Sequence, residues 1–188
     1  MNVHFDHGKY VYIKLCAFLY LFLIAGTVFS QNISFEKYLA NFKRLKLPLD
    51  INQEMVIKIA KNKDFMKDSV ISKFIGAKFY PIDARVYLHH YFGCLVKNDS
   101  ITAIIYLKTA IVQGEHYVVE VALYNSKSEK LIEKMLISSY SISDENGEQF
   151  SASEVGKDYS ISTAHGFFKM TTKGFKVLRG KKEETADW

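Results

Sequence analysis

The spacing of apolar residues changes partway along the chain, and this change constrains the fold more than any other feature. After Pro81 the side chains alternate with a period of two, which is the pattern of strands with two different faces. Residues 85–97 and 101–110 show it first, and residues 117–124 and 131–140 repeat it. Because the turns between these segments are short, the strands cannot cross over the sheet, and neighbours must be antiparallel.

Three shorter strands are expected after these. They cover residues 158–163, 167–171 and 174–178, and the turns His165-Gly166 and Lys173-Gly174 separate them. We therefore predict an antiparallel meander of about five to seven strands within residues 81–180.

The region before Pro81 has a helical period instead. Between residues 33 and 45 the apolar side chains recur three and four positions apart, after a suitable N-cap at Ser34. Pro48 ends this helix, and a second short helix is expected from Ser69 to Phe74. The predicted fold class is therefore α+β. A helical N-terminal segment, residues 31–80, packs on the antiparallel sheet of residues 81–180 in one domain, and a charged tail covers residues 181–188.

An uncharged apolar run, residues 15–29, follows Lys9 and Lys14. A basic start and a short apolar core are typical of a secretory signal peptide. The run is shorter than the roughly 20 residues that span a bilayer, which argues against a retained anchor. We predict a signal peptide over residues 1–30 and a mature protein in the periplasm or outside the cell.

The end of this segment suits a signal peptidase. Val28 and Ser30 occupy the −3 and −1 positions, so cleavage is expected before Gln31. Cys16 lies at the start of the apolar run and is not placed to accept a lipid. Contact with the membrane is therefore expected only through the signal peptide, before cleavage.

Composition excludes several classes of partner and site. Cys94 is the only cysteine after residue 30, so no internal disulfide can form, and its apolar neighbours predict a buried structural thiol. The formal net charge is +5, but the lysines stand singly, as on a solvated helix face, and we expect no nucleic-acid partner. The usual zinc spacings are missing, and we expect no metal and no cofactor.

The common catalytic motifs are missing as well. The sequence contains no Gly-x-x-x-x-Gly-Lys, Gly-x-Gly-x-x-Gly or Gly-x-Ser-x-Gly. We therefore expect a domain that is not an enzyme. The alternative is an extracytoplasmic hydrolase that pairs a histidine with a carboxylate. The residues considered for that alternative are His89, His165, Asp83, Glu120 and Asp158.

One face of the predicted sheet is rich in tyrosine. A tyrosine ring is flat and apolar and carries a hydroxyl, which suits a sugar, a peptide or another protein surface. The amphipathic helix at residues 33–45 offers a second interpretation, because it must bury its apolar side and this face would receive it. Both interpretations stay open. The candidate binding residues are Tyr87, His89, Tyr91, Tyr106, Glu120 and Tyr124.

Four sequence segments follow one another along the chain: residues 47–49, 68–76, 79–83 and the hairpin 121–132. Because of the order of these segments, the chain after residue 30 resembles secreted proteins of unknown function from Bacteroidetes. In the hairpin, Asn125 replaces the family's aspartate and Glu129 its glycine. The resemblance implies an exported envelope protein, often a lipoprotein, although this chain lacks the cysteine that would accept the lipid. It implies no catalytic residues.

Together these observations predict an exported cell-envelope protein. We expect it to bind a partner, either an unknown envelope protein or a glycan, without catalysing a reaction.

The signal peptide is directly testable. Protein collected from the periplasm or the medium should begin at Gln31, within a few residues, by mass spectrometry of its N-terminal peptide. Leu21→Arg together with Leu23→Arg should hold the precursor in the cytoplasm, because each charge in the apolar core costs a few kcal/mol. A full-length chain stable in the membrane fraction with Met1 intact would contradict the prediction.

Overall fold

The computed structural model describes residues 33–76, 87–110, 116–143 and 147–181. The chain divides into two compact units, residues 1–34 and 35–188, and every helix and strand described below belongs to the second unit. Three expectations lie outside the described residues: the signal peptide at 1–30, the role of Asp83, and the tail beyond residue 181.

Five consecutive strands form the first sheet. They are β2 (Tyr87–Lys97), β3 (Ile101–Ala110), β4 (His116–Asn125), β5 (Leu131–Ser143) and β6 (Gly147–Ser151). Each pairs antiparallel with the next strand in the chain. Asn98 shapes the turn between β2 and β3, since its Oδ1 accepts the backbone N–H groups of Ser100 and Ile101, both at 2.9 Å.

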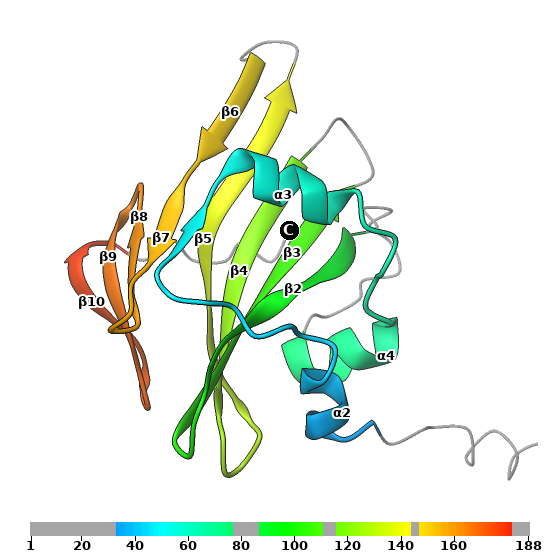
Figure 1. Ribbon diagram of the computed structural model, residues 1–188, viewed down its shortest axis with the longest axis vertical. Helices are drawn as coiled ribbons and strands as arrows, with labels where there is room; N and C mark the ends of the chain where they lie inside the picture. The colour runs from blue at the N-terminus through cyan, green and yellow to red at the C-terminus, as the bar shows by residue number, and fades with distance from the viewer. Residues whose placement is uncertain (1–32, 77–86, 111–115, 144–146, 182–188) are drawn as a thin grey trace, which may run out of the picture. The chain divides into compact units, whose positions relative to one another are not determined.

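A second antiparallel sheet has the order β1-β7-β8-β9-β10. Its strands are β1 (Leu49–Ile51), β7 (Ser153–Val155), β8 (Ser160–Thr163), β9 (Gly166–Thr171) and β10 (Gly174–Gly180). Only Ala152 separates β6 from β7, so the chain passes directly from one sheet into the other (Figure 1).

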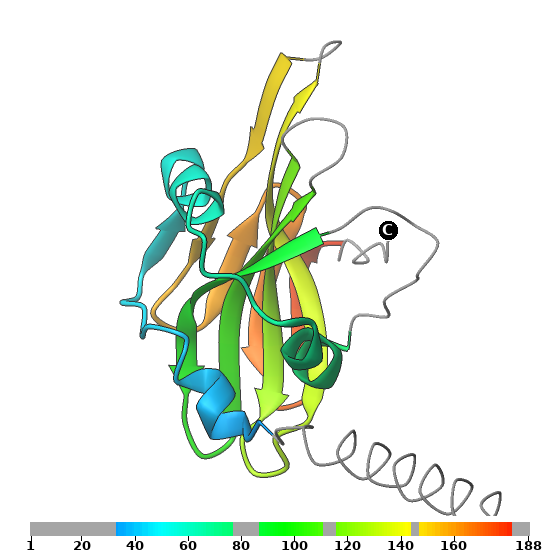
Figure 2. The same ribbon diagram turned by 90° about the vertical axis from the view of Figure 1, so that its right-hand side faces the viewer.

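The main hydrophobic core lies between the two sheets, which are stacked in Figure 2. Helix α3 (Gln53–Ala60) covers the part of the first sheet that the second sheet leaves free, and it begins at Asn52, whose side chain accepts the Met55 N–H. Burial of this apolar surface is the main force holding the two sheets together. Central core residues are Val56, Ile105, Val121, Leu123, Ile161, Phe168 and Met170.

The opposite face of the first sheet is covered by α2 (Phe35–Leu39), α4 (Asp68–Val70) and the π-helical turn η1 (Ile71–Ile75) (Figure 2). Tyr38 of α2 stacks on Phe74 of η1, with ring centroids 4.4 Å apart. The Tyr124 hydroxyl of β4 donates to the Phe74 carbonyl at 3.0 Å and lies 3.3 Å from the Tyr38 hydroxyl. One tyrosine of the sheet thus connects both helical segments.

The expected α+β fold class is wrong. The described part of the chain is mostly β, with two five-stranded antiparallel sheets and only short helices, rather than a helical segment packed on one meander. Residues 31–80 contribute β1, and the expected meander divides at Ala152. The sequence pattern does not predict the second sheet, because β1 and β7 have only three residues each. A strand of that length is too short to show an alternating pattern.

The first helix is also shorter than its apolar spacing predicts. It ends at Leu39, and after a turn at residues 40–42 the chain runs beside β2, where Arg44 forms a bridge with Cys94. There the Leu45 N–H donates to the Cys94 carbonyl and the Cys94 N–H donates to the Lys43 carbonyl, both at 2.9 Å. These bonds satisfy part of the open edge of β2, which a longer helix would leave unpaired.

Tyr124→Phe tests how strongly this helical layer is held. Loss of the hydroxyl leaves the Phe74 carbonyl and the Tyr38 hydroxyl buried without their partner, so we expect the free energy of unfolding to fall by about 1–3 kcal/mol. Urea denaturation measures this change. Tyr87→Phe, at a partly exposed side chain, is the control and should stay within about 0.5 kcal/mol of the parent. Equal stability of the two variants would contradict the role of Tyr124.

Candidate functional site

The residues expected to form a tyrosine-rich binding face lie on the helix-covered side of the first sheet. Across the strands His89 is opposite Lys108, Tyr91 is opposite Tyr106, and Tyr106 is opposite Glu120. The six candidate residues differ in how far they are exposed to solvent. Tyr87 and Tyr91 are partly exposed, whereas the other four candidates are buried: His89, Tyr106, Glu120 and Tyr124.

A hydrogen-bonded network surrounds Glu120, which is only 1% exposed. Its carboxylate accepts a hydrogen bond from the Tyr106 hydroxyl and one from the Lys108 ammonium, the latter at 2.8 Å. Burial raises the pKa of Tyr106, and the nearby Glu120 charge raises it further, so the phenol keeps its proton. A buried carboxylate is costly unless it is paired, and these two donors supply the pairing.

His89 lies beside this network without a hydrogen bond to Glu120, whose two oxygens are held by Tyr106 and Lys108. Its ring stacks on Tyr106 at 5.9 Å, and its Nδ1 has no hydrogen-bond partner among the described residues. Burial, and then the positive charge of Lys108, lower the pKa of His89 to about 4. The pair is therefore not arranged as a base with its orienting acid.

Asp158 and His165, which are also candidates for hydrolysis, lie in turns of the second sheet. Asp158 accepts hydrogen bonds from Lys169 at 2.7 Å and from the Ser160 hydroxyl at 2.6 Å, and the Lys169 contact lowers the pKa of Asp158 most. His165 is exposed at the turn between β8 and β9. Among the described residues, no hydrogen bond joins His89 to Glu120, and Asp158 is held by Lys169 and Ser160.

Two further groups are structural. His90 points to the core side of the first sheet, where its Nε2 lies 3.1 Å from the Thr109 hydroxyl. Cys94 is buried, which raises the pKa of its thiol and keeps it protonated. Within the described ranges no group of histidine, cysteine, aspartate and glutamate could hold a metal ion. In the same ranges no helix has the length and apolar character needed to cross a membrane.

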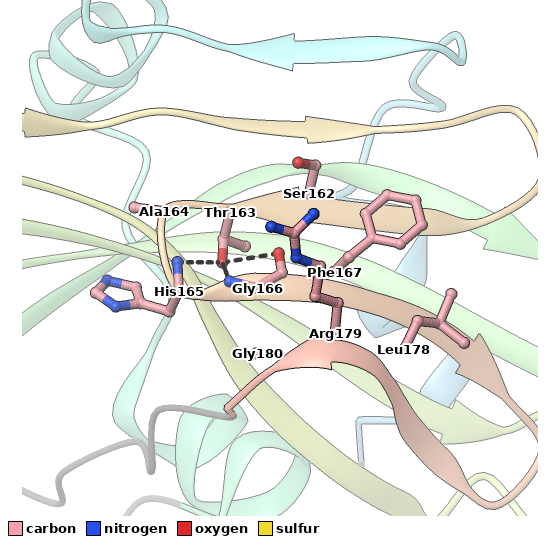
Figure 3. Close-up of a pocket in the computed structure, with 9 residues that line it drawn as sticks. All are labelled: Ser162, Thr163, Ala164, His165, Gly166, Phe167, Leu178, Arg179 and Gly180. Carbon is pink, nitrogen blue, oxygen red and sulfur yellow. Dashed lines mark hydrogen bonds between the residues drawn. The ribbon is translucent and has the colours of Figure 1, made fainter.

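A hollow of about 480 Å³ lies on the second sheet, between the β8–β9 turn and β10 (Figure 3). Thr163 shapes this turn, because its hydroxyl accepts the N–H groups of His165 at 3.1 Å and of Gly166 at 3.2 Å. A Cβ on Gly166 would stand 2.4 Å from the Arg179 carbonyl oxygen, so only glycine permits this approach of β9 to β10. The residues lining the hollow are Ser162, Thr163, Ala164, His165, Gly166, Phe167, Leu178, Arg179 and Gly180.

Apolar and cationic side chains meet at the hollow. Phe167 and Leu178 are 39% and 48% exposed, which is unusual for residues of their size, and the Arg179 side chain extends toward Ser162 beside the Phe167 ring. The His165 ring points away from Ser162 in Figure 3, so the two are not a nucleophile and its base. This combination of exposed apolar surface and a cationic group suits the binding of a ligand.

Sequence reasoning missed this hollow, although one signal pointed to it. Phe167 and Phe168 are adjacent in a strand, so one of the two rings must face away from the core. Arg179 lies beyond the expected end of the last strand at residue 178. An irregular register between Val177 and Arg179 then places Arg179 opposite Phe167, which alternation alone does not predict.

Searches with protein-family models, among curated proteins and among solved structures found no match to this chain. The likeness to secreted Bacteroidetes proteins therefore rests on the sequence segments alone, and it stays a prediction.

The buried His89 should make stability depend on pH. Its pKa is about 4 in the folded state and about 6.5 in the unfolded state, so the unfolded chain binds more protons between these values. Stability should fall as the pH drops from 6.5 toward 4, by up to roughly 3 kcal/mol from this group. His89→Asn should flatten the slope in urea denaturation measured across this range. A slope unchanged by the substitution would contradict this assignment.

Proposed function

We propose that the chain is an exported, non-catalytic binding domain of the cell envelope, located in the periplasm or outside the cell. The ligand binds at the hollow on the outer face of the second sheet. The observation that carries this proposal is the exposure there of Phe167, Leu178 and Arg179 around a concave surface. A binding site typically combines apolar surface with a few converging polar groups.

The rest of the molecule supports a binding role. On the helix-covered side of the first sheet, Tyr106 and Lys108 hold the buried Glu120 carboxylate. Tyr124 links α2 to η1. These groups stabilise the layers, which leaves the outer face of the second sheet as the better candidate for a ligand. Export is inferred from the basic start, the apolar run and the small residues that end at Ser30.

The chain supplies a matched control for a test of this surface. Phe65 is 38% exposed, nearly the same as Phe167, but it packs against the His90 ring at 4.9 Å, beside the first sheet. Phe65→Ala and Phe167→Ala therefore remove the same side chain with the same exposure from different places.

The exported protein is immobilised and incubated with envelope extract that contains both soluble protein and insoluble wall polysaccharide. We expect the parent and Phe65→Ala to retain the same envelope component, and Phe167→Ala to lose it. Both variants should still unfold in one cooperative transition in urea, since neither ring belongs to the main core. Retention of nothing, or of material that both variants bind equally, would refute the proposed site.

A further inference from the structure

The outer face of the second sheet carries a row of side chains that crosses all five strands. The strand register pairs Asp50 with Glu154, Glu154 with Ser162, Ser162 with Phe167, and Phe167 with Arg179. Residues paired across strands point to the same face. All five are exposed, and we call them the outer row. With strands about 4.8 Å apart, the row is roughly 19 Å long.

Hydrogen-bond acceptors and donors lie at opposite ends of the outer row. Two carboxylates, Asp50 and Glu154, lie at one end and accept hydrogen bonds only. The Arg179 guanidinium at the other end donates only, and the Ser162 hydroxyl between them does both. Phe167 supplies a flat apolar surface beside Arg179. A matching ligand needs an apolar patch surrounded by groups that donate and accept alike.

Hydroxyl groups have this double capacity, and a sugar ring carries several of them around faces of C–H groups. A ring laid on Phe167 would place hydroxyls near Arg179 and Ser162, whose side chains lie together beside the Phe167 ring (Figure 3). The row is also long enough for more than one sugar, because it continues to Glu154 and Asp50. An extended glycan therefore complements both the shape and the hydrogen-bonding capacity of this face.

The charges of the row disfavour other ligands. Arg179 alone would attract an anion, but Glu154 and Asp50 would repel a polyanion that extended along the row. A polycation that extended along the row would be repelled by Arg179. The row thus favours a ligand without net charge.

Resting on the function proposed above, we propose that the outer row binds a neutral glycan chain. One sugar ring stacks on Phe167, and its hydroxyls bond to Arg179 and Ser162. The following sugars reach Glu154.

The exported protein is applied to an array of neutral and acidic oligosaccharides, and the strongest neutral ligand is then titrated by calorimetry. We expect neutral glycans to bind. Phe167→Ala should weaken the affinity about tenfold or more, and Glu154→Gln and Arg179→Ala about three- to tenfold each. Phe65→Ala should leave it unchanged. Affinity should hardly change between 0.05 and about 0.5 M salt, because no charged group of the ligand takes part.

Several outcomes would overturn the glycan proposal: an array without neutral ligands, binding confined to acidic glycans with strong salt dependence, or neutral binding that survives Phe167→Ala. If the array is blank while the parent still retains an envelope protein that Phe167→Ala loses, the glycan proposal fails and the binding function stands. If the array and the envelope extract are both blank, both proposals fail.

Discussion

The structure depends on the first sheet being apolar on both faces. Ile105 and Val121 face one side, Ile104 and Ala122 face the other, and all four are fully buried. Neither side can be left to water without a large loss of hydrophobic stabilisation, so the sheet needs a layer on each face. The second sheet with α3 provides one layer, and the segments α2, α4 and η1 provide the other. The outer row of the second sheet stays exposed.

Polar side chains inside this arrangement determine how the layers align. Stacked aromatic rings alone would allow α2 to shift along the sheet. The hydrogen bond between Tyr124 and Tyr38 fixes its position. Glu120 depends on Tyr106 and Lys108, so β3 and β4 are fixed in one register around it. Such groups add little net stability, since burial costs about what their bonds return, but shifted packings would leave them unpaired.

The sequence predicted the parts of the fold whose signals are local. The turn at Asn98-Asp99-Ser100 and the strands on either side of it lie where alternation places them. The helix expected to reach Leu45 ends early because hydrogen bonds to Cys94, far along the chain, favour extended backbone there. The separation into two sheets and the outer row depend on register between distant strands, such as Asp50 with Glu154. No local pattern contains that information.

The pairing of β1 with β7 also affects the order in which the chain can fold. Residues 49–51 obtain their strand partner only when residues 153–155 exist, and α2 needs Tyr124 before its aromatic side chains have a surface. During synthesis from the N-terminus, β1 and α2 therefore lack these partners until the strands that supply them have been made. The second sheet is thus completed late, because its first strand and its other four strands lie at opposite ends of the described chain.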